Sequence, residues 1–258
     1  MSKLRAKCPD CGGYTAVALG PSYQCHSCGR EFGAGLVRVP RAWGEGGEPM
    51  AAAARLPMPY PEAAVVDEDS LPEQTFAVAA DLPDRPLIFG GCCCAHVGAI
   101  EALSARHGRI AVVWFDAHGD LNTIESSPSG NAWATPLRQV IDSGAVRAED
   151  VALVGARNLD PPEEEFIAQT GVATGVDAVA AVLERTSCVY VAFDADVVEP
   201  GELEVFMPEP GGLALDEAES ILREIASRAA VLGAGFTAHA PEERNVAPLT
   251  RLAAALGL

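Results

Sequence analysis

Two clusters of polar side chains follow long apolar stretches of the chain: Asp116, His118 and Asp120 come after RIAVVWF, and Asp194 and Asp196 come after CVYVAF. Alternate residues of an extended strand point the same way, so each cluster would aim its side chains together. Several carboxylates buried at one place need a counter-charge. Four carboxylates and an imidazole suit two divalent cations, which can lower the pKa of a bridging water enough to give hydroxide at neutral pH. The alternative is that these residues only cap loops at strand ends.

Four cysteines near the N-terminus form a second candidate metal site. Cys8 and Cys11 are one Cys-x2-Cys pair, Cys25 and Cys28 are another, and thirteen residues separate the pairs. This spacing is typical of a structural zinc ribbon. A segment of about 30 residues buries too little apolar surface to fold alone, so a zinc ion would supply its folding free energy. The alternative is a pair of redox-active Cys-x2-Cys motifs.

The candidate ligands must be positioned by the elements around them. After a stretch rich in Gly and Pro, Val/Ile/Ala-rich runs alternate with helical patterns, which indicates a parallel sheet covered on both faces. We expect a zinc ribbon over 1–34 and a three-layer α/β/α hydrolase domain with a mainly parallel sheet over 35–258, with its chemistry at the carboxyl ends of the strands. Strands are expected at 86–91, 109–118, 151–157, 188–196 and 231–239, and helices at 95–107, 135–144, 161–171, 176–186, 215–229 and 249–258.

Composition narrows the classes of protein. The chain has 258 residues, of which 49% are hydrophobic and 21% charged, and this balance is typical of a globular protein. Its formal charge of -18 makes nucleic acid an unfavourable partner. No apolar run approaches the roughly 18 residues of a membrane span. The N-terminal MSKLRAKCPDC lacks the apolar region of a signal peptide, so we expect a cytoplasmic protein whose eight cysteines serve metal or catalytic chemistry.

Over roughly residues 86–258 the motifs resemble, in order, those of the arginase/agmatinase ureohydrolases, a family of binuclear manganese hydrolases. The segments that carry the resemblance are FGGCCCAHVGAI, WFDAHGDLNT, SGNAWATPL, VGARNLDPPE, and FDADVVEP with PGGL. The resemblance implies that Asp116 and Asp194 bridge two Mn2+ or other divalent ions. It also implies that Asp120 binds one ion and orients the hydroxide, while His118 and Asp196 complete the other ion. Family members commonly form trimers or hexamers, so a homo-oligomer is expected by resemblance.

The resemblance also implies a small-molecule substrate and the residues that hold it. Asn122, Ser129, Asn131, Asp160 and Glu163 fall where family members bind the carboxylate and amine of an amino acid.

The sixth metal ligand departs from the family pattern. The family histidine that follows the paired glycines is similar in position to Cys93 here. A thiolate can take that place, and its softer sulfur would favour zinc, iron or cobalt over manganese. His96, three residues later at the start of a helix, is the alternative ligand, and it could also be a polar residue near the pocket wall.

Two further departures concern the substrate. The histidine that shuttles protons in arginases is replaced by Trp133, whose indole cannot titrate near neutrality but could stack on a planar cation or simply pack. The acid that clamps the guanidinium is replaced by Ala238, which offers no bidentate partner. The neighbouring His239 could donate to a substrate or act as a base, or it could be a capping or surface residue.

The sequence therefore predicts a binuclear metal-dependent hydrolase of a C–N bond in a guanidino or amidino compound, distinct from an ordinary arginase. Its catalytic residues would be Asp120 and His239, and its substrate pocket would include Trp133. The alternative function is a non-catalytic scaffold of the same fold, whose zinc ribbon binds a protein partner.

Overall fold

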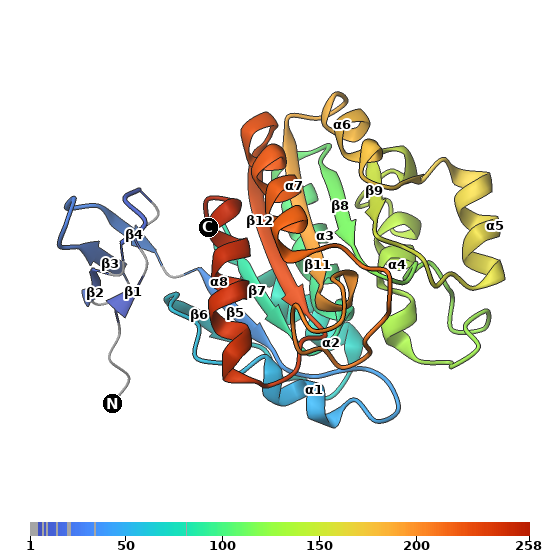
Figure 1. The fold of residues 1–258 in the computed structure, drawn as a ribbon, viewed down its shortest axis with the longest axis horizontal. Helices are drawn as coiled ribbons and strands as arrows, with labels where there is room; N and C mark the ends of the chain where they lie inside the picture. The colour runs from blue at the N-terminus through green and yellow to red at the C-terminus, as the bar shows by residue number, and fades with distance from the viewer. Residues whose placement is uncertain are drawn as a thin grey trace.

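The computed structural model describes the chain from residue 5 to residue 258 with short gaps. The described residues are 5–6, 8, 10–13, 15–19, 22–33, 35–80 and 82–258. They form two sheets, one of four strands and one of eight. Figure 1 shows the small sheet lying outside the layers that are built on the large one.

The large sheet has the strand order β10-β9-β8-β11-β12-β7-β5-β6, and its pairings between described residues are parallel. Its strands are β5 (Leu36–Val39), β6 (Glu62–Val65), β7 (Leu87–Gly90), β8 (Ala111–Phe115), β9 (Val151–Val154), β10 (Ala173–Thr174), β11 (Cys188–Asp194) and β12 (Ala230–Thr237). Strands β7, β8, β9, β11 and β12 lie where the apolar runs of the sequence predict them. Together with the helices on both faces, they confirm the three-layer α/β/α fold.

Eight α-helices are present in the described part of the chain. They are α1 (Glu48–Ala53), α2 (Leu71–Ala80), α3 (Val97–His107), α4 (Pro136–Asp142), α5 (Pro161–Thr170), α6 (Asp177–Leu183), α7 (Leu215–Arg228) and α8 (Val246–Ala255). Figure 1 shows α6, α7 and α8 in front of the large sheet and α2, α3 and α4 behind it. No helix among the described residues has the length and apolar character that crossing a membrane requires.

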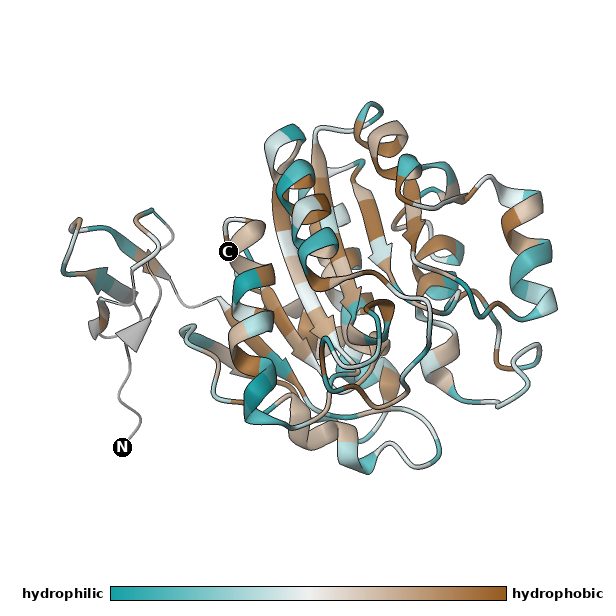
Figure 2. Ribbon diagram, in the orientation of Figure 1, coloured by the Kyte–Doolittle hydropathy of each residue, from teal (hydrophilic) through white to brown (hydrophobic). Residues whose placement is uncertain are grey.

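The core lies on both faces of the large sheet because its central strands are apolar on both sides. In β8, Val113 and Phe115 belong to the cluster that packs against α6, α7 and α8, whereas Val112 and Trp114 belong to the cluster that packs against α2, α3 and α4. Figure 2 shows these strands as hydrophobic, with the hydrophilic residues on the outer surfaces of the helices. This alternation is the pattern expected for a strand buried between two helix layers.

The sequence did not predict the elements between residues 35 and 85. Strands β5 and β6 and helices α1 and α2 all lie in the stretch whose only clear sequence feature is its Gly and Pro content. The four-residue strand β5 is too short to show a periodic pattern, although it is mostly buried. The edge strand β6 is equally short and mostly exposed, so its residues also show no alternating pattern.

The small sheet is antiparallel with the order β1-β2-β3-β4. Its strands are β1 (Arg5–Ala6), β2 (Ala16–Leu19), β3 (Ser22–Cys25) and β4 (Glu31–Gly33). Cys8, Ala16, Tyr23 and Cys25 form its small buried cluster. So few apolar residues provide little stability by themselves, which leaves a role for bound metal.

Candidate metal centre and active-site cavity

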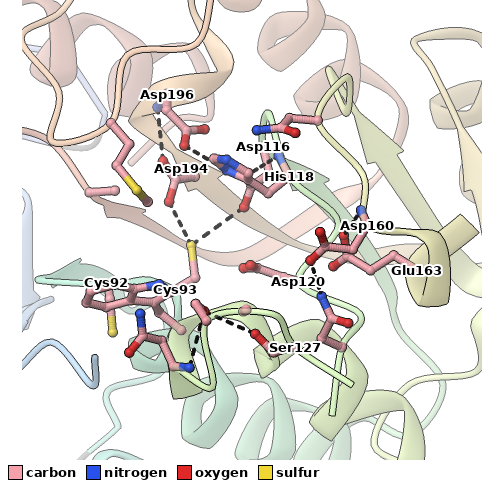
Figure 3. A pocket seen from close by; sticks show the side chains of 18 of the residues that line it. Cys92, Cys93, Asp116, His118, Asp120, Ser127, Asp160, Glu163, Asp194 and Asp196 are labelled. Carbon is pink, nitrogen blue, oxygen red and sulfur yellow. Dashed lines mark hydrogen bonds and ion pairs between the residues drawn. The ribbon is translucent and has the colours of Figure 1, made fainter. Parts of the chain in front are cut away.

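The two polar clusters meet because their strands are neighbours in register. Phe115 at the end of β8 pairs with Phe193 of β11, so Asp116 and Asp194 leave the sheet side by side. On the other side of β11, Asp194 pairs with Thr237 of β12. The carboxyl ends of these parallel strands therefore bring the acidic side chains to one edge of the sheet, as Figure 3 shows.

The side chains at this edge form two overlapping sets of possible ligand atoms. In each set, one atom from every residue lies within 4.8 Å of the others. One set consists of Cys93, Asp116 and Asp120, and the other of Asp116, His118 and Asp196. Asp116 is common to both sets, which is the arrangement that two adjacent cations sharing a carboxylate would need.

Asp194 lies beside both sets. Its Oδ2 is 3.0 Å from Sγ of Cys93, while its Oδ1 accepts a hydrogen bond of 2.9 Å from the backbone N–H of Asp196. That backbone belongs to a 3-10 turn, Ala195–Val197, which Asp194 caps. The turn therefore holds one oxygen of Asp194 and leaves the other directed at the cluster.

Neighbouring donors also orient Asp116. The backbone N–H of His118 donates to its Oδ1 at 2.7 Å, and Nε1 of Trp114 donates to its Oδ2 at 3.1 Å. His118 in turn places Nδ1 3.0 Å from Oδ2 of Asp196. Contacts within the chain thus orient these candidate ligands even without a bound cation.

The buried acids lack enough positive charge around them. Burial, with the charges of Asp116 and Asp194, raises the pKa of Asp120 well above its usual value, and burial with Asp196 and Asp116 does the same for Asp194. Oδ2 of Asp120 is buried and has no hydrogen-bond partner. No Lys or Arg is found among the described residues that line the cavity at this edge. A bound cation would supply the missing counter-charge.

The raised pKa of His118 also reflects the excess of negative charge in the cluster. Burial lowers the pKa of its imidazole, but Asp116 and Asp196 outweigh that effect and raise the pKa to about 12. Without a cation, the imidazolium is the counter-charge of this half of the cluster. A histidine ligand must be neutral, so a metal ion that replaced this proton would release it.

Two residues that the sequence analysis did not single out support the cluster. The Arg157 guanidinium donates to the backbone carbonyls of Asp196 at 2.8 Å, Glu209 at 2.7 Å and Pro210 at 3.0 Å. It therefore joins the end of β9 to the loop that follows Asp196. Arg157 lies in the quoted VGARNLD segment, but contacts with backbone carbonyls leave no periodic signal that would identify them.

Glu209 is the second such residue. Its Oε1 lies 3.7 Å from Nε2 of His118, on the opposite side of the ring from Asp116 and Asp196, and accepts a hydrogen bond of 3.2 Å from Nδ2 of Asn158. Glu209 can therefore fix the orientation of the His118 ring.

The cluster forms the base of a cavity of about 290 Å3. All the predicted substrate-binding residues line it, and they are Asn122, Ser129, Asn131, Trp133, Asp160 and Glu163. Nδ2 of Asn122 donates to Oδ2 of Asp160 at 2.9 Å. Oδ1 of Asn131 accepts a hydrogen bond of 2.9 Å from the backbone N–H of Glu45. One wall of the cavity is therefore rich in amide, hydroxyl and carboxylate groups.

Glu163 has a structural task at the edge of this wall. Its Oε2 accepts a hydrogen bond from the backbone N–H of Asp160 at 2.9 Å, which completes the capping box at the start of α5. Its Oε1 accepts another, of 3.0 Å, from the backbone N–H of Leu121. A Cβ on Gly119 would lie 2.7 Å from the Glu163 carboxyl group, so a larger residue here would displace that carboxyl group. Glu163 thus ties the Asp160 loop to the segment that carries Asp120.

Of the three histidines considered in the sequence analysis, His118 lines the cavity, whereas His96 and His239 do not. His96 is buried, with Nδ1 3.0 Å from the Tyr190 hydroxyl, and burial lowers its pKa to about 3. His239 is also buried, and its Nε2 is 3.1 Å from the carbonyl oxygen of Ala53. The structure therefore brings Cys93, rather than His96, to the acidic cluster, and places His239 outside the cavity wall.

The four N-terminal cysteines lie together in the small sheet. One sulfur atom from each of Cys8, Cys11, Cys25 and Cys28 lies within 4.8 Å of the others. Gly12 donates its backbone N–H to the carbonyl of Cys8, and Gly29 donates to that of Cys25. Both glycines have φ near +70°, which makes each a suitable residue for these tight turns. The cluster is compatible with a four-cysteine metal site.

Comparison with known proteins finds similarity to arginases. The model of the family described as Arginase family matches residues 49–257. Arginase from Bacillus caldovelox is 31% identical over 189 residues, which cover 62% of this chain and 63% of that protein. The chain thus spans less than two thirds of the length of this curated relative.

Solved structures share the fold at lower identity. Arginase from Bacillus subtilis aligns with a TM-score of 0.73 and 22% identity, covering 86% of this chain and 97% of that chain. Formimidoylglutamase from Bacillus subtilis aligns with a TM-score of 0.64 and 21% identity, covering 76% of this chain and 72% of that chain.

Proposed function

Since the chain belongs to the arginase family, we propose that it is a hydrolase that uses two divalent metal ions to cleave a C–N bond in a guanidino or amidino compound. The observation that carries the proposal is the pair of ligand sets that share Asp116. The unpartnered Oδ2 of Asp120 supports it, because a buried carboxylate oxygen without a donor is costly unless a cation or substrate completes it.

The residues would divide the metal-binding work between the two sets. Cys93, Asp116, Asp120 and Asp194 would hold one ion, and Asp116, His118, Asp194 and Asp196 would hold the other. When bound, such a pair of cations lowers the pKa of a water molecule and stabilises negative charge that develops at the reacting carbon. The metals would be manganese or another divalent ion, with one structural zinc in the N-terminal cluster.

Asp120 is the residue that we propose for proton transfer. Its backbone is in the left-handed region, with φ of 54°, and its side chain lines the cavity. Its free Oδ2 could accept a proton from the attacking water and pass it to the leaving nitrogen. His239, which the sequence suggests as a second catalytic residue, would not take part in this chemistry, since its imidazole does not border the cavity.

The substrate would be a small molecule held by the polar wall, through Asn122, Ser129, Asn131 and Asp160. Ordinary arginase activity is not proposed, because Ala238 cannot pair with a guanidinium and Trp133 cannot shuttle a proton. We also propose a cytoplasmic homo-oligomer, by analogy with relatives in the family.

The loss of polar groups at Trp133 and Ala238 favours a second candidate function. The chain could be a non-catalytic scaffold whose N-terminal ribbon binds a protein partner. The retained carboxylate cluster argues against this alternative, because keeping several buried acids without using them is costly.

Metal analysis combined with a substrate screen tests the proposal. The protein would be expressed with added manganese, purified without chelator, and analysed for metals per chain by elemental mass spectrometry. We expect about two ions besides one zinc, and release of urea or ammonia from some guanidino or amidino compound. The double variant Asp194→Asn/Asp196→Asn should lose the two ions, keep the zinc and lose the activity. Zinc alone in the native protein, after metal is added back, would favour the scaffold.

A further inference from the structure

The cavity has a second wall that differs from the polar one. Met50, Cys92, Trp133, Met207 and Ala238 line it, and we call these five residues the apolar wall. Met50, Cys92 and Ala238 belong to one packed cluster, against which Trp133 packs. Four of the five residues of the apolar wall thus belong to, or pack against, one internal hydrophobic cluster that reaches the cavity.

The backbone around Gly44 and Gly47 and the ring of Phe206 hold the Trp133 indole in place. A Cβ on Gly44 would lie 2.4 Å from the indole ring, and a Cβ on Gly47 would lie 3.1 Å from it. The ring therefore rests on the glycine-rich backbone between β5 and α1. The ring of Phe206 meets it in an edge-on contact at 6.3 Å. Fixed in this way, the indole offers a planar, apolar surface to whatever occupies the cavity.

The apolar wall has no acceptor for a cation with several N–H groups. None of its five side chains carries an oxygen atom, and Ala238 occupies its position with φ of 56°. An unsubstituted guanidinium placed against the apolar wall would leave N–H donors without partners, which is unfavourable. A substituent in place of an N–H, or on the amidino carbon, would remove that cost and gain apolar contact. The delocalised cation that remains could stack on Trp133.

We propose that the apolar wall selects amidino or guanidino compounds in which the end facing the wall carries an alkyl or aryl substituent, over compounds such as a simple alkylguanidine that present an unsubstituted NH2 group there. This inference rests on the proposed function, which places the reacting carbon beside Asp116 and Asp120. Water would add to that carbon, a C–N bond would break, and the nitrogen would leave as ammonia or an amine with a proton from the water. The products would be a substituted amide or urea and that amine.

Calorimetric binding to the metal-loaded protein tests the selection. The probes are guanidinium, acetamidine, butyramidine and benzamidine, which all carry one positive charge. We expect affinity to rise in that order, by about 15-fold from acetamidine to butyramidine, since each of the two added methylenes contributes roughly fourfold when buried. Equal binding of guanidinium and butyramidine, or no binding of any probe, would overturn the inference.

Substitutions at Ala238 provide a matched pair. Asp and Asn both tolerate the left-handed backbone of this position, and they have nearly the same shape. Ala238→Asp should strengthen guanidinium binding at least about tenfold, as expected for a new charged partner, and weaken benzamidine binding. Ala238→Asn should show no such preference for guanidinium, because it adds no charge. The same result from both variants would contradict the charge argument.

Trp133→Leu gives an independent measurement if Ala238→Asp fails to fold. It should remove the advantage of benzamidine over butyramidine, since the stacking surface is lost. An unchanged advantage would contradict the role of the indole. Failure of the proposed function remains distinguishable, because it would show as graded probe binding with no ammonia release from any amidine and no pair of metal ions besides the zinc.

Discussion

Sγ of Cys93 lies 3.0 Å from Oδ2 of Asp194, inside the buried acidic cluster. Burial raises the pKa of this thiol well above its usual value, and the charges of Asp194, Asp120 and Asp116 raise it further. The thiol therefore keeps its proton unless a cation compensates for the added negative charge. If a cation binds here, the thiolate gives the site a soft ligand among hard carboxylates.

Exchange of Cys93 should change both the amount and the identity of the bound metal. Cys93→Ser should lower the metal content by up to one ion per chain, because a hydroxyl binds cations more weakly than a thiolate does. Cys93→His should restore occupancy and favour manganese over zinc or cobalt relative to the native protein. Elemental analysis after equilibration with equal concentrations of the metals measures both effects.

Cys188→Ser is the control for these variants. Cys188 begins β11, at the end of the strand remote from Asp194, and belongs to none of the ligand sets found among the described residues. Its metal content should match that of the native protein. If Cys93→Ser also keeps the native metal content and preference, Cys93 is not a ligand.

Removal of the metals should destabilise the fold more at high pH than at low pH. Burial raises the pKa values of Asp120, Asp194 and Asp196, and the neighbouring carboxylates raise that of His118. A group with a raised pKa stabilises the fold in its protonated form, so the metal-free protein loses stability as pH rises above about 4. Metal binding favours the deprotonated ligands, so its contribution grows in the same direction.

Thermal melting with and without chelator, at about pH 6 and about pH 8, checks this expectation. Metal at a thousand times its Kd adds about 4 kcal/mol, which corresponds to a shift of roughly 10 °C for a chain of this size. The shift should be larger at the higher pH. In Asp194→Asn/Asp196→Asn only the contribution of the ribbon should remain. A shift that shrinks as pH rises would contradict the electrostatic argument.

Glu209 should strengthen metal binding without touching the metal. Its Oε1 faces Nε2 of His118 at 3.7 Å, so the carboxylate can hold the ring with Nδ1 toward Asp116 and Asp196. Loss of such a partner typically costs about 10- to 100-fold in metal affinity. We therefore expect Glu209→Gln to bind the ion beside His118 at least about tenfold more weakly, measured by competition with a chelator.

The matched control is Glu202→Gln. Glu202 is an exposed residue of the same connection between β11 and α7, and its replacement removes the same charge. Equal metal affinities of the two variants would show that Glu209 acts through net charge alone, and would remove its positioning role.

The central sheet and the meeting of the acidic residues follow from the sequence because both depend on local patterns. Apolar runs predict the central strands, and the carboxyl ends of adjacent parallel strands bring Asp116 and Asp194 together. The contacts of Arg157 and Glu209 depend instead on how an irregular loop returns to the strand ends. No periodic pattern encodes such a return.

The position of His239 could not be predicted from the strand pattern, because one backbone angle ends that pattern before it. Ala238 has φ of 56°, so the alternation of β12 ends there. His239 then turns to an interior contact, with its ring centroid 5.1 Å from that of Phe89 and its Nε2 near Ala53. A left-handed alanine cannot be recognised from sequence, because this conformation is usually associated with Gly, Asn or Asp.

The N-terminal cysteine cluster should be a separate zinc site that stabilises its own small sheet. The Thr15 hydroxyl lies 3.2 Å from Sγ of Cys25, and this hydrogen bond, with others from neighbouring backbone N–H groups, lowers the pKa of that thiol to about 5. Cys25 is therefore prepared to act as a thiolate ligand at neutral pH.

Cys25→Ser should remove one zinc ion per chain and lower the melting temperature of the ribbon, since the sheet has few buried apolar residues. The two ions of the acidic cluster should be unaffected, and Cys188→Ser should retain all of the metal. Native zinc content and native melting in Cys25→Ser would exclude the ribbon as a zinc site, whereas simultaneous loss of all metals would mean that the two clusters do not fold independently.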